Sequence, residues 1–264
     1  MKAEVVMNDR TWSPVPGYRG IIAVDAEGFS KRTDVSQEHM AGFIPEVLAE
    51  SFRLADLEEV WAGREFPSHR GDGYAFGFDA GKMPGVIDPW LATLQKTLMA
   101  SEPLSGGPLR LRVSLNIGPL RVDGGPHDGS GTARNDTHRL LNATVLKRLL
   151  AAASRDVTRV VAIVSDQCFE DVVRSGGRTL HPDHFCAVSA TVREKQFARR
   201  AWVHVPTPSG NLLAAGITAL LSGEDSADDV RVSSSQGAAH VFNHATGNLN
   251  NGEIGGDQSI TFRA

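Results

Sequence analysis

The chain has 264 residues, of which 41% are hydrophobic and 22% charged, as expected for a globular domain with an appendage. Its formal net charge of -4 excludes a broad basic surface for nucleic acid or for an acidic membrane.

The two cysteines, Cys168 and Cys186, are too few for a disulfide framework and do not form a C-x-x-C metal motif. Charges and two prolines occur within residues 1–20, where a signal peptide needs an apolar run. No apolar run reaches the ~18 residues that a membrane span requires. We therefore expect a cytoplasmic protein with free thiols and no membrane partner.

The first elements form a strand, a helix and a hairpin. Residues 20–25 (GIIAVD) predict a buried strand that ends in a carboxylate, and residues 26–34 a polar turn containing Gly28. Apolar residues at helical spacing predict a helix over 37–56. The Asp-Gly pair within 65–78 (EFPSHRGDGYAFGF) favours a β-hairpin.

The remaining elements alternate between helices and strands. We expect helices over 89–99, 135–153 and 166–173, and strands over 109–118, 157–165, 185–192 and 201–205. The fold class is α+β: a ferredoxin-like βαββαβ arrangement with an added αββ and a polar C-terminal tail.

The composition changes near residue 206. We expect an N-terminal segment (1–17), a catalytic domain (18–206) and a remainder (207–264) with a short helix over 211–221. Residues 236–260 are rich in Asn, Gly and Gln, which fits either a disordered tail or a self-pairing cross-β motif. The second alternative resembles the amyloid-like signalling motifs of bacterial immune proteins, and it implies an effector partner recruited through the tail.

Two aspartates stand where phosphoryl chemistry would need them. Asp25 ends a strand before a glycine-containing turn, and Asp72 lies on the predicted hairpin. Carboxylates can hold divalent ions that activate a hydroxyl and neutralise phosphates, and the backbone N–H groups of residues 26–30 can donate to phosphates. Each aspartate alone fits equally well as an ordinary strand-end or hairpin residue.

Over residues 18–206 the chain resembles the class III nucleotidyl cyclase family. The segment VDAEGFS resembles the family's Asp-x-x-Gly-Phe-Thr/Ser element. The resemblance implies that Asp25 is the first metal ligand and that the Ala26 carbonyl is an auxiliary one. It also places Gly28 and Phe29 in the substrate-binding turn.

Two further segments carry the resemblance. RGDGYAF resembles the family's Gly-Asp hairpin, which implies that Asp72 is the second metal ligand. RVSLNIGPL resembles the strand that reads Arg-hydrophobic-Gly-hydrophobic-His-x-Gly, although Ser114 and Asn116 replace the small residue and the His.

The most specific match is DGSGTARNDTHRL. Asp128, Gly131, Asn135 and Arg139 stand at the family's offsets of an Asp, a Gly, an Asn and an Arg. The resemblance implies that Asp128 contacts the base, Asn135 positions the ribose and Arg139 stabilises the transition state. Asn135 and Arg139 are also i and i+4, so they share one helix face.

The resemblance also implies an assembly. Arg193 stands where the family often has a lysine that holds the triphosphate. In the family the two aspartates come from one protomer and the Asn and Arg from the other, so the resemblance implies a homodimer with two Mg²⁺ or Mn²⁺ ions per site.

Base preference is left open by the sequence. Adenylate cyclases of the family carry a lysine, and guanylate cyclases a glutamate, where this chain has Ser68. In lacking a residue that selects a purine, the chain resembles the pyrimidine cyclases of bacterial anti-phage (Pycsar) systems, which make cyclic UMP or cyclic CMP. ATP is the alternative substrate, because Asp128 can accept from an exocyclic amine of adenine as well as from that of cytosine.

We therefore expect an enzyme that converts a nucleoside triphosphate to a 3′,5′-cyclic nucleotide and pyrophosphate by two-metal catalysis at a homodimer interface. Two other functions stay open: a catalytically silent cyclase-fold module, and a tail-driven interaction protein whose globular part only dimerises.

Overall fold

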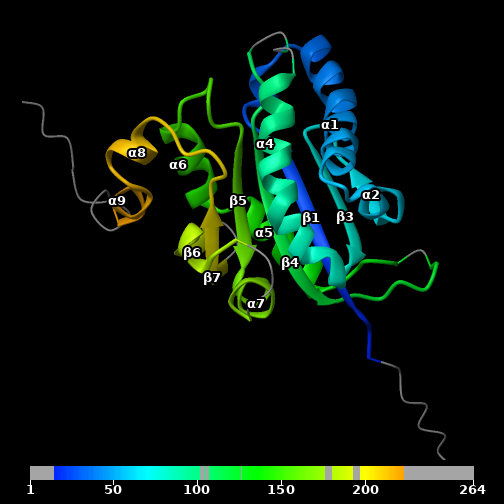
Figure 1. Ribbon diagram of the computed structural model, residues 1–264. Helices are drawn as coiled ribbons and strands as arrows, with labels where there is room; N and C mark the ends of the chain where they lie inside the picture. The colour runs from blue at the N-terminus through cyan, green and yellow to red at the C-terminus, as the bar shows by residue number, and fades with distance from the viewer. Residues whose placement is uncertain are drawn as a thin grey trace, which may run out of the picture. The chain divides into compact units, whose positions relative to one another are not determined.

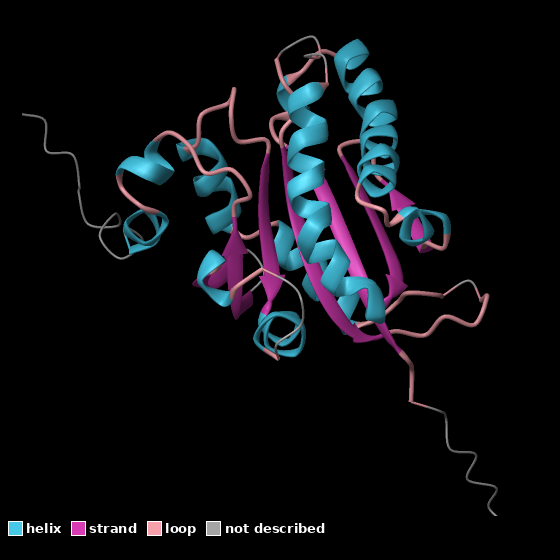
Figure 2. Cartoon of the chain, in the orientation of Figure 1, coloured by secondary structure: helices cyan, strands magenta, loops and turns pink. Residues whose placement is uncertain are grey.

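The structure is a computed structural model that describes residues 15–101, 104, 107–125, 127–175, 180–192 and 197–222. Within these residues one sheet is covered by helices on both faces, which confirms the α+β class (Figures 1 and 2). Two expectations, for Arg193 and for residues 236–260, lie outside the described residues.

The described sheet has seven strands in the order β2-β3-β1-β4-β5-β7-β6. Only the β4–β5 pair in it is parallel. The order β2-β3-β1-β4 is that of a ferredoxin-like βαββαβ unit, as predicted. The strands are β1 Tyr18–Ala26, β2 Glu65–His69, β3 Gly73–Asp79, β4 Leu111–Pro119, β5 Val160–Ser165, β6 Cys186–Val192 and β7 Phe197–His204.

The described helices connect these strands and extend beyond β7. They are α1 Asp34–Leu54, α2 Glu58–Ala62, α3 Met83–Gly85, α4 Leu91–Ala100, α5 Thr132–Leu141, α6 Thr144–Ala152, α7 Asp166–Cys168, α8 Asn211–Ala214 and α9 Ile217–Ser222. Within the described part of the chain, no helix is both long and apolar enough to cross a membrane.

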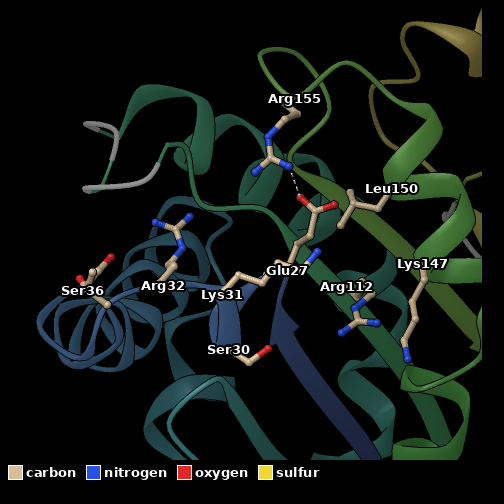
Figure 3. Close-up of a pocket in the computed structure, with 11 residues that line it drawn as sticks. Glu27, Ser30, Lys31, Arg32, Ser36, Arg112, Lys147, Leu150 and Arg155 are labelled. Carbon is tan, nitrogen blue, oxygen red and sulfur yellow. Dashed lines mark ion pairs between the residues drawn. The ribbon is translucent and has the colours of Figure 1, made fainter.

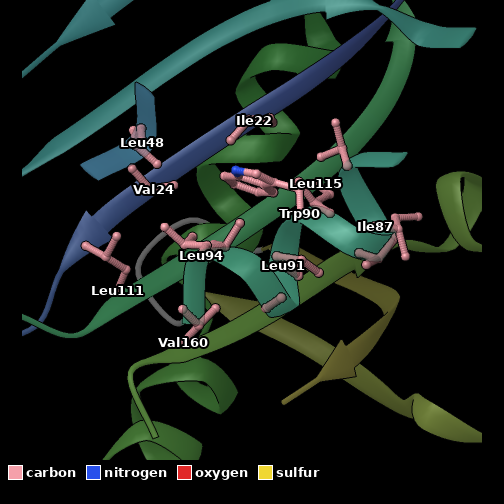
Figure 4. Packing of buried hydrophobic residues seen from close by; sticks show 14 of the residues in the cluster. Ile22, Val24, Leu48, Ile87, Trp90, Leu91, Leu94, Leu111, Leu115 and Val160 are labelled. Atoms are coloured by element: carbon pink, nitrogen blue, oxygen red, sulfur yellow. The ribbon is translucent and has the colours of Figure 1, made fainter. Parts of the chain in front are cut away.

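Alternation along the strands decides what each face carries. On β1, Ile22 and Val24 point into the core beneath α1 and α4, where large apolar side chains fill the space (Figure 4). On the opposite face, Ile21 packs with α5 and Ala23 packs against its last residue, Leu141. Asp25 has the same parity as Ile21 and Ala23, so its carboxylate belongs to the face covered by α5 and α6.

The core beneath α1 and α4 is closed by stacked aromatic rings. Phe52 of α1 stacks on Trp90 with ring centroids 4.6 Å apart, and both side chains are fully buried. The Trp90 indole N–H donates to Ser51 Oγ at 2.9 Å, so the one polar atom of this ring is satisfied inside the core.

Several helix boundaries in the structure differ from those predicted from the sequence. The helix expected over 135–153 is two helices, α5 and α6, because Ala143 adopts an extended conformation (φ -58°, ψ 137°). The helix expected over 211–221 is also two, α8 and α9, with Gly216 at φ +78° between them. Both cysteines are free.

β2 is the outermost strand at one end of the described sheet. Its pairing with β3 shifts register between Glu65 and Ser68, and the exposed Pro67 lies within that irregular stretch. Proline has no N–H to donate, which is tolerated at a sheet edge and not in a central strand.

Candidate active site

Asp25 is held by a cross-strand arginine. It lies opposite Arg112 in the β1–β4 register. Arg112 Nε donates to one Asp25 carboxylate oxygen at 2.7 Å, and Nη2 donates to the other at 2.8 Å. Both side chains are 13% exposed, so this bidentate pair is partly shielded from water.

Burial changes the acidity of Asp25. The pKa of its carboxyl is raised to about 6, mainly by desolvation and to a smaller extent by the charge of Asp72, while Arg112 and, more weakly, Lys147 lower it. The opposing effects of Asp72 and Lys147 mean that both side chains lie within electrostatic range of Asp25.

The hairpin between β2 and β3 brings Asp72 to the end of β1. The Ala26 N–H donates to the Asp72 carbonyl at 2.8 Å, and Gly73 is paired with Asp25. A Cβ at Gly73 would lie 2.6 Å from the Val24 carbonyl oxygen, so only glycine allows this approach. The Gly-Asp-Gly motif therefore sets the two aspartates at one edge of the sheet.

This donor set suits a hard divalent cation. Asp25, Asp72 and the Ala26 carbonyl are oxygen donors, and Mg²⁺ is commonly held by one or two carboxylates, with water and substrate phosphates as further ligands. Within the described residues no cluster of three or more His, Cys, Asp or Glu side chains is close enough to hold a metal. Two carboxylates and one carbonyl are fewer ligands than octahedral Mg²⁺ takes, so water and substrate phosphates would have to supply the others.

The turn after β1 leaves room for a ligand. Gly28 has φ +70°, and a side chain added there would meet nothing within 4 Å. The Lys31 N–H donates back to the Gly28 carbonyl at 3.1 Å, which closes the turn. Phe29 packs against the core and approaches Gly71, so its ring anchors the turn to the hairpin.

A cavity of about 760 Å³ opens beside this turn (Figure 3). One wall comes from the turn itself and the start of α1, another from α6 and the loop after it, and Arg112 contributes from β4. The charged lining residues are Glu27, Lys31, Arg32, Arg112, Lys147 and Arg155. Five cations and one carboxylate give the lining a positive charge, which favours an anionic ligand.

Asp128 is engaged within its own loop. Its carboxylate accepts from the Asp123 N–H at 3.0 Å and the Gly124 N–H at 2.9 Å. These backbone hydrogen bonds, the one from Asp123 foremost, lower the pKa of Asp128. Asp128 therefore holds the loop before α5 through these backbone hydrogen bonds.

Asn135 and Arg139 lie on α5 and do not line the cavity beside Asp25. Asn135 is exposed. Arg139 Nη1 donates to Asp136 at 2.9 Å, and its guanidinium lies 5.6 Å from the Phe197 ring centroid. In the described part of the chain, neither residue forms a hydrogen bond or an ion pair with Asp25 or Asp72.

Ser68 is half-buried on β2, where it pairs with Ala75. Gly131 directly precedes α5, and its carbonyl accepts from the Asn135 N–H at 3.2 Å. Ser114 is fully buried, and its hydroxyl has no hydrogen-bond partner among the described residues.

Sequence reasoning missed all six charged residues that line this cavity. Arg112 lies in the recognised RVSLNIGPL segment, and a β1–β4 pairing that set it opposite Asp25 would have identified it. Glu27, Lys147 and Arg155 carried no signal, because the cavity they share depends on where α6 packs.

No protein-family model matches the chain, and no curated protein matches it. Solved structures that it resembles include adenylyl and guanylyl cyclase domains. A bacterial light-regulated adenylyl cyclase has a TM-score of 0.49 and 14% identity, with 80% of this chain and 58% of that chain covered. This chain therefore spans less than two thirds of that protein.

Two shorter structures are covered almost completely. The catalytic core of a rhodopsin-guanylyl cyclase with converted specificity, in complex with ATPαS, has a TM-score of 0.42 and 14% identity over 73% of this chain and 97% of that one. An adenylate/guanylate cyclase/hydrolase from Silicibacter pomeroyi has a TM-score of 0.44 and 17% identity over 71% and 95%. At these scores the likenesses assign no substrate or activity.

Proposed function

We propose that the chain is a nucleotidyl cyclase, which converts a nucleoside triphosphate to a 3′,5′-cyclic nucleotide and pyrophosphate. One observation carries the proposal: the Asp72 backbone is bonded to the end of β1 next to Asp25, and Arg112, which holds Asp25, lines a cationic cavity. The sequence motifs that resemble class III cyclases support the same chemistry.

In this reaction the 3′-hydroxyl attacks the α-phosphorus and pyrophosphate leaves, so negative charge builds on phosphate oxygens. Asp25, Asp72 and the Ala26 carbonyl would hold two Mg²⁺ or Mn²⁺ ions, which activate the hydroxyl and neutralise the phosphates. Backbone N–H groups of the turn around Gly28 and Phe29 would bind phosphate oxygens.

The remaining roles fall to a second copy of the chain. Asn135 would position the ribose, Arg139 would stabilise charge on the α-phosphate, and Arg193 would hold the triphosphate. The resemblance to class III cyclases, in which these residues come from the other protomer, supports a head-to-tail homodimer with shared sites.

We propose a pyrimidine triphosphate as substrate, giving cyclic UMP or cyclic CMP for anti-phage signalling. Ser68 offers neither a cation nor an anion to a purine edge, and Asp128 would contact the base with a carboxylate that also holds its own loop. ATP is the alternative substrate. An effector bound through residues 207–264 would read the product.

A catalytically silent nucleotide-binding module is the second candidate. The observation that favours it is the Arg112 fork, which engages both carboxylate oxygens of Asp25. In that case nucleotide would bind and no cyclic product would form.

The test is to incubate the purified chain with ATP, GTP, CTP or UTP and Mn²⁺ or Mg²⁺, and to detect cyclic products by mass spectrometry. Asp25→Asn, nearly equal in volume, is the matched control. A cyclic product formed by the wild type and not by Asp25→Asn would support a cyclase, and its identity would give the base that the enzyme accepts. Nucleotide binding without product in every combination would favour the silent module.

A further inference from the structure

The cavity beside Asp25 has a charge opposite to that of the whole chain. The chain carries a net charge of -4, yet five cations face one carboxylate in this cavity. Lys31 and Arg32 come from the turn before α1, Arg112 from β4, and Lys147 and Arg155 from α6 and the loop after it. Cations on opposing walls suit an elongated anion better than a single phosphate.

Some of these cations are already engaged. Arg112 holds Asp25, and Arg155 Nη1 lies 3.0 Å from a Glu27 carboxylate oxygen. In the described part of the chain, Lys31 and Lys147 form no ion pair, and both are exposed at the cavity. The positive charges of Lys31 and Lys147 are therefore available to an anionic ligand.

Lys147 comes from α6 and lines the same cavity as Arg112 (Figure 3). In Figure 3 both side chains extend toward the same end of the cavity, away from the Glu27–Arg155 pair. An anion that contacts both would lie beside Asp25, at the position where candidate metal ligands and candidate phosphate ligands meet.

A buried arginine fixes the two walls relative to each other. Arg110 is 2% exposed; its Nη2 donates to the Leu150 carbonyl of α6 at 2.5 Å, and its Nε donates to the Thr158 carbonyl at 2.9 Å. Its Nη1 donates to Glu27, in the turn after β1, at 3.1 Å. The cavity is thus built before any ligand arrives, which lowers the entropic cost of binding.

We propose that Lys147, on α6 of the same chain that carries Asp25, is a further binding residue for the phosphates of a nucleotide in this cavity. The ligand is the triphosphate of a nucleotide or the pyrophosphate released from it. The place of this step in a reaction rests on the proposed cyclase function, whereas the binding itself does not. All the cavity residues that would contact the phosphates come from one protomer.

The test is isothermal titration of the full chain with sodium tripolyphosphate, pyrophosphate, UTP and UMP, each with and without Mg²⁺. Lys147→Gln should weaken tripolyphosphate, pyrophosphate and UTP binding by about tenfold or more, as expected for a lost charge-assisted hydrogen bond. Lys147→Arg should retain most of the affinity. UMP should bind weakly to every variant.

Lys96→Gln is the matched control, since Lys96 is exposed on α4, on the opposite face of the sheet. An equal loss in Lys147→Gln and Lys96→Gln, or no tripolyphosphate binding by the wild type, would overturn the proposal. Tripolyphosphate binding that depends on Lys147, without cyclase turnover, would support the role of Lys147 and reject the cyclase function. Turnover with unchanged KM and unchanged polyphosphate affinity in Lys147→Gln would support the cyclase function and reject the role of Lys147.

Discussion

Asp25 and Arg112 form a bidentate ion pair across β1 and β4, with both carboxylate oxygens engaged at 2.7 and 2.8 Å. A candidate metal ligand is thus neutralised by a neighbouring strand before any cation binds. A metal ion at Asp25 would compete with Arg112 for the carboxylate, and a bound nucleotide could draw the guanidinium toward its phosphates. The effect of Arg112 on metal binding can therefore be measured without following turnover.

Replacing Arg112 should make Asp25 harder to ionise. Arg112 is the largest influence that lowers the pKa of Asp25, so in Arg112→Gln that pKa should rise above its present value of about 6. The pH at which Mn²⁺ binding is half lost, followed by electron paramagnetic resonance, should move upward. Arg53→Gln, which breaks an exposed pair with Glu50 on α1, should leave it unchanged. Equal midpoints in both variants would show that the pair is not formed in solution.

The stability of the metal-free chain should depend on pH through Asp25. Its pKa is about 6 in the folded chain and 3.8 in the reference state, so the folded state binds more protons between these values. Ionised Asp25 therefore costs stability above pH 6, on the order of 3 kcal/mol, and the cost disappears as pH falls toward 4.

Urea unfolding in EDTA at pH 7.5 and pH 5, compared between wild type and Asp25→Asn, measures this dependence. The free energy of unfolding of Asp25→Asn relative to wild type should be higher at pH 7.5 than at pH 5. A difference that does not change with pH would contradict the raised pKa.

Catalysis should depend on residues from both halves of the proposed site. Asp72→Ala and Arg139→Ala should each lower turnover by roughly a hundredfold or more, because each removes electrostatic stabilisation of the transition state. A mixture of the two inactive variants should regain activity, since one site per heterodimer keeps all wild-type residues. If the mixture stays inactive although the subunits exchange, the site is not shared.

The spacing between α5 and the sheet should depend on Gly118. A Cβ at this position of β4 would lie 2.6 Å from the Ala133 Cβ, so Gly118→Ala forces α5 away from the sheet. We expect a loss of about 1–3 kcal/mol in the free energy of unfolding. Lower turnover should follow, because α5 carries Asn135 and Arg139.

Gly42→Ala is a control for Gly118→Ala in which the opposite change in stability is expected. Gly42 is exposed in α1 with open space around it, so an alanine there should stabilise the chain by about 1 kcal/mol. Thermal unfolding of both variants measures the two effects. Stabilisation by Gly118→Ala would mean that α5 does not pack this closely.

Local patterns in the sequence predicted the strands and the order of the fold. β1 and the β2–β3 hairpin follow from an apolar run and an Asp-Gly turn, which act over a few residues. The single helix predicted over 135–153 was wrong because the apolar spacing of Leu140 and Leu141 continues into Val145 and Leu146. The break at Ala143 reflects packing: α5 lies against β1 and β4, while α6 lies against β5 and β6.

The candidate site was predicted only in part. Asp25 and Asp72 could be found because a short turn and a hairpin carry them. The Arg112 pair requires the β1–β4 register, and the cavity wall with Lys147 requires the position of α6. Both depend on contacts between residues far apart in the chain, which periodicity does not encode.

The irregular edge strand β2 limits how copies of this domain can associate. A regular outer strand would offer a row of free amides and carbonyls to a neighbouring molecule. Pro67 removes one of those amides, and the register shift between Glu65 and Ser68 bends the strand out of line. Continuous sheets that grow from domain to domain through the β2 edge are therefore disfavoured.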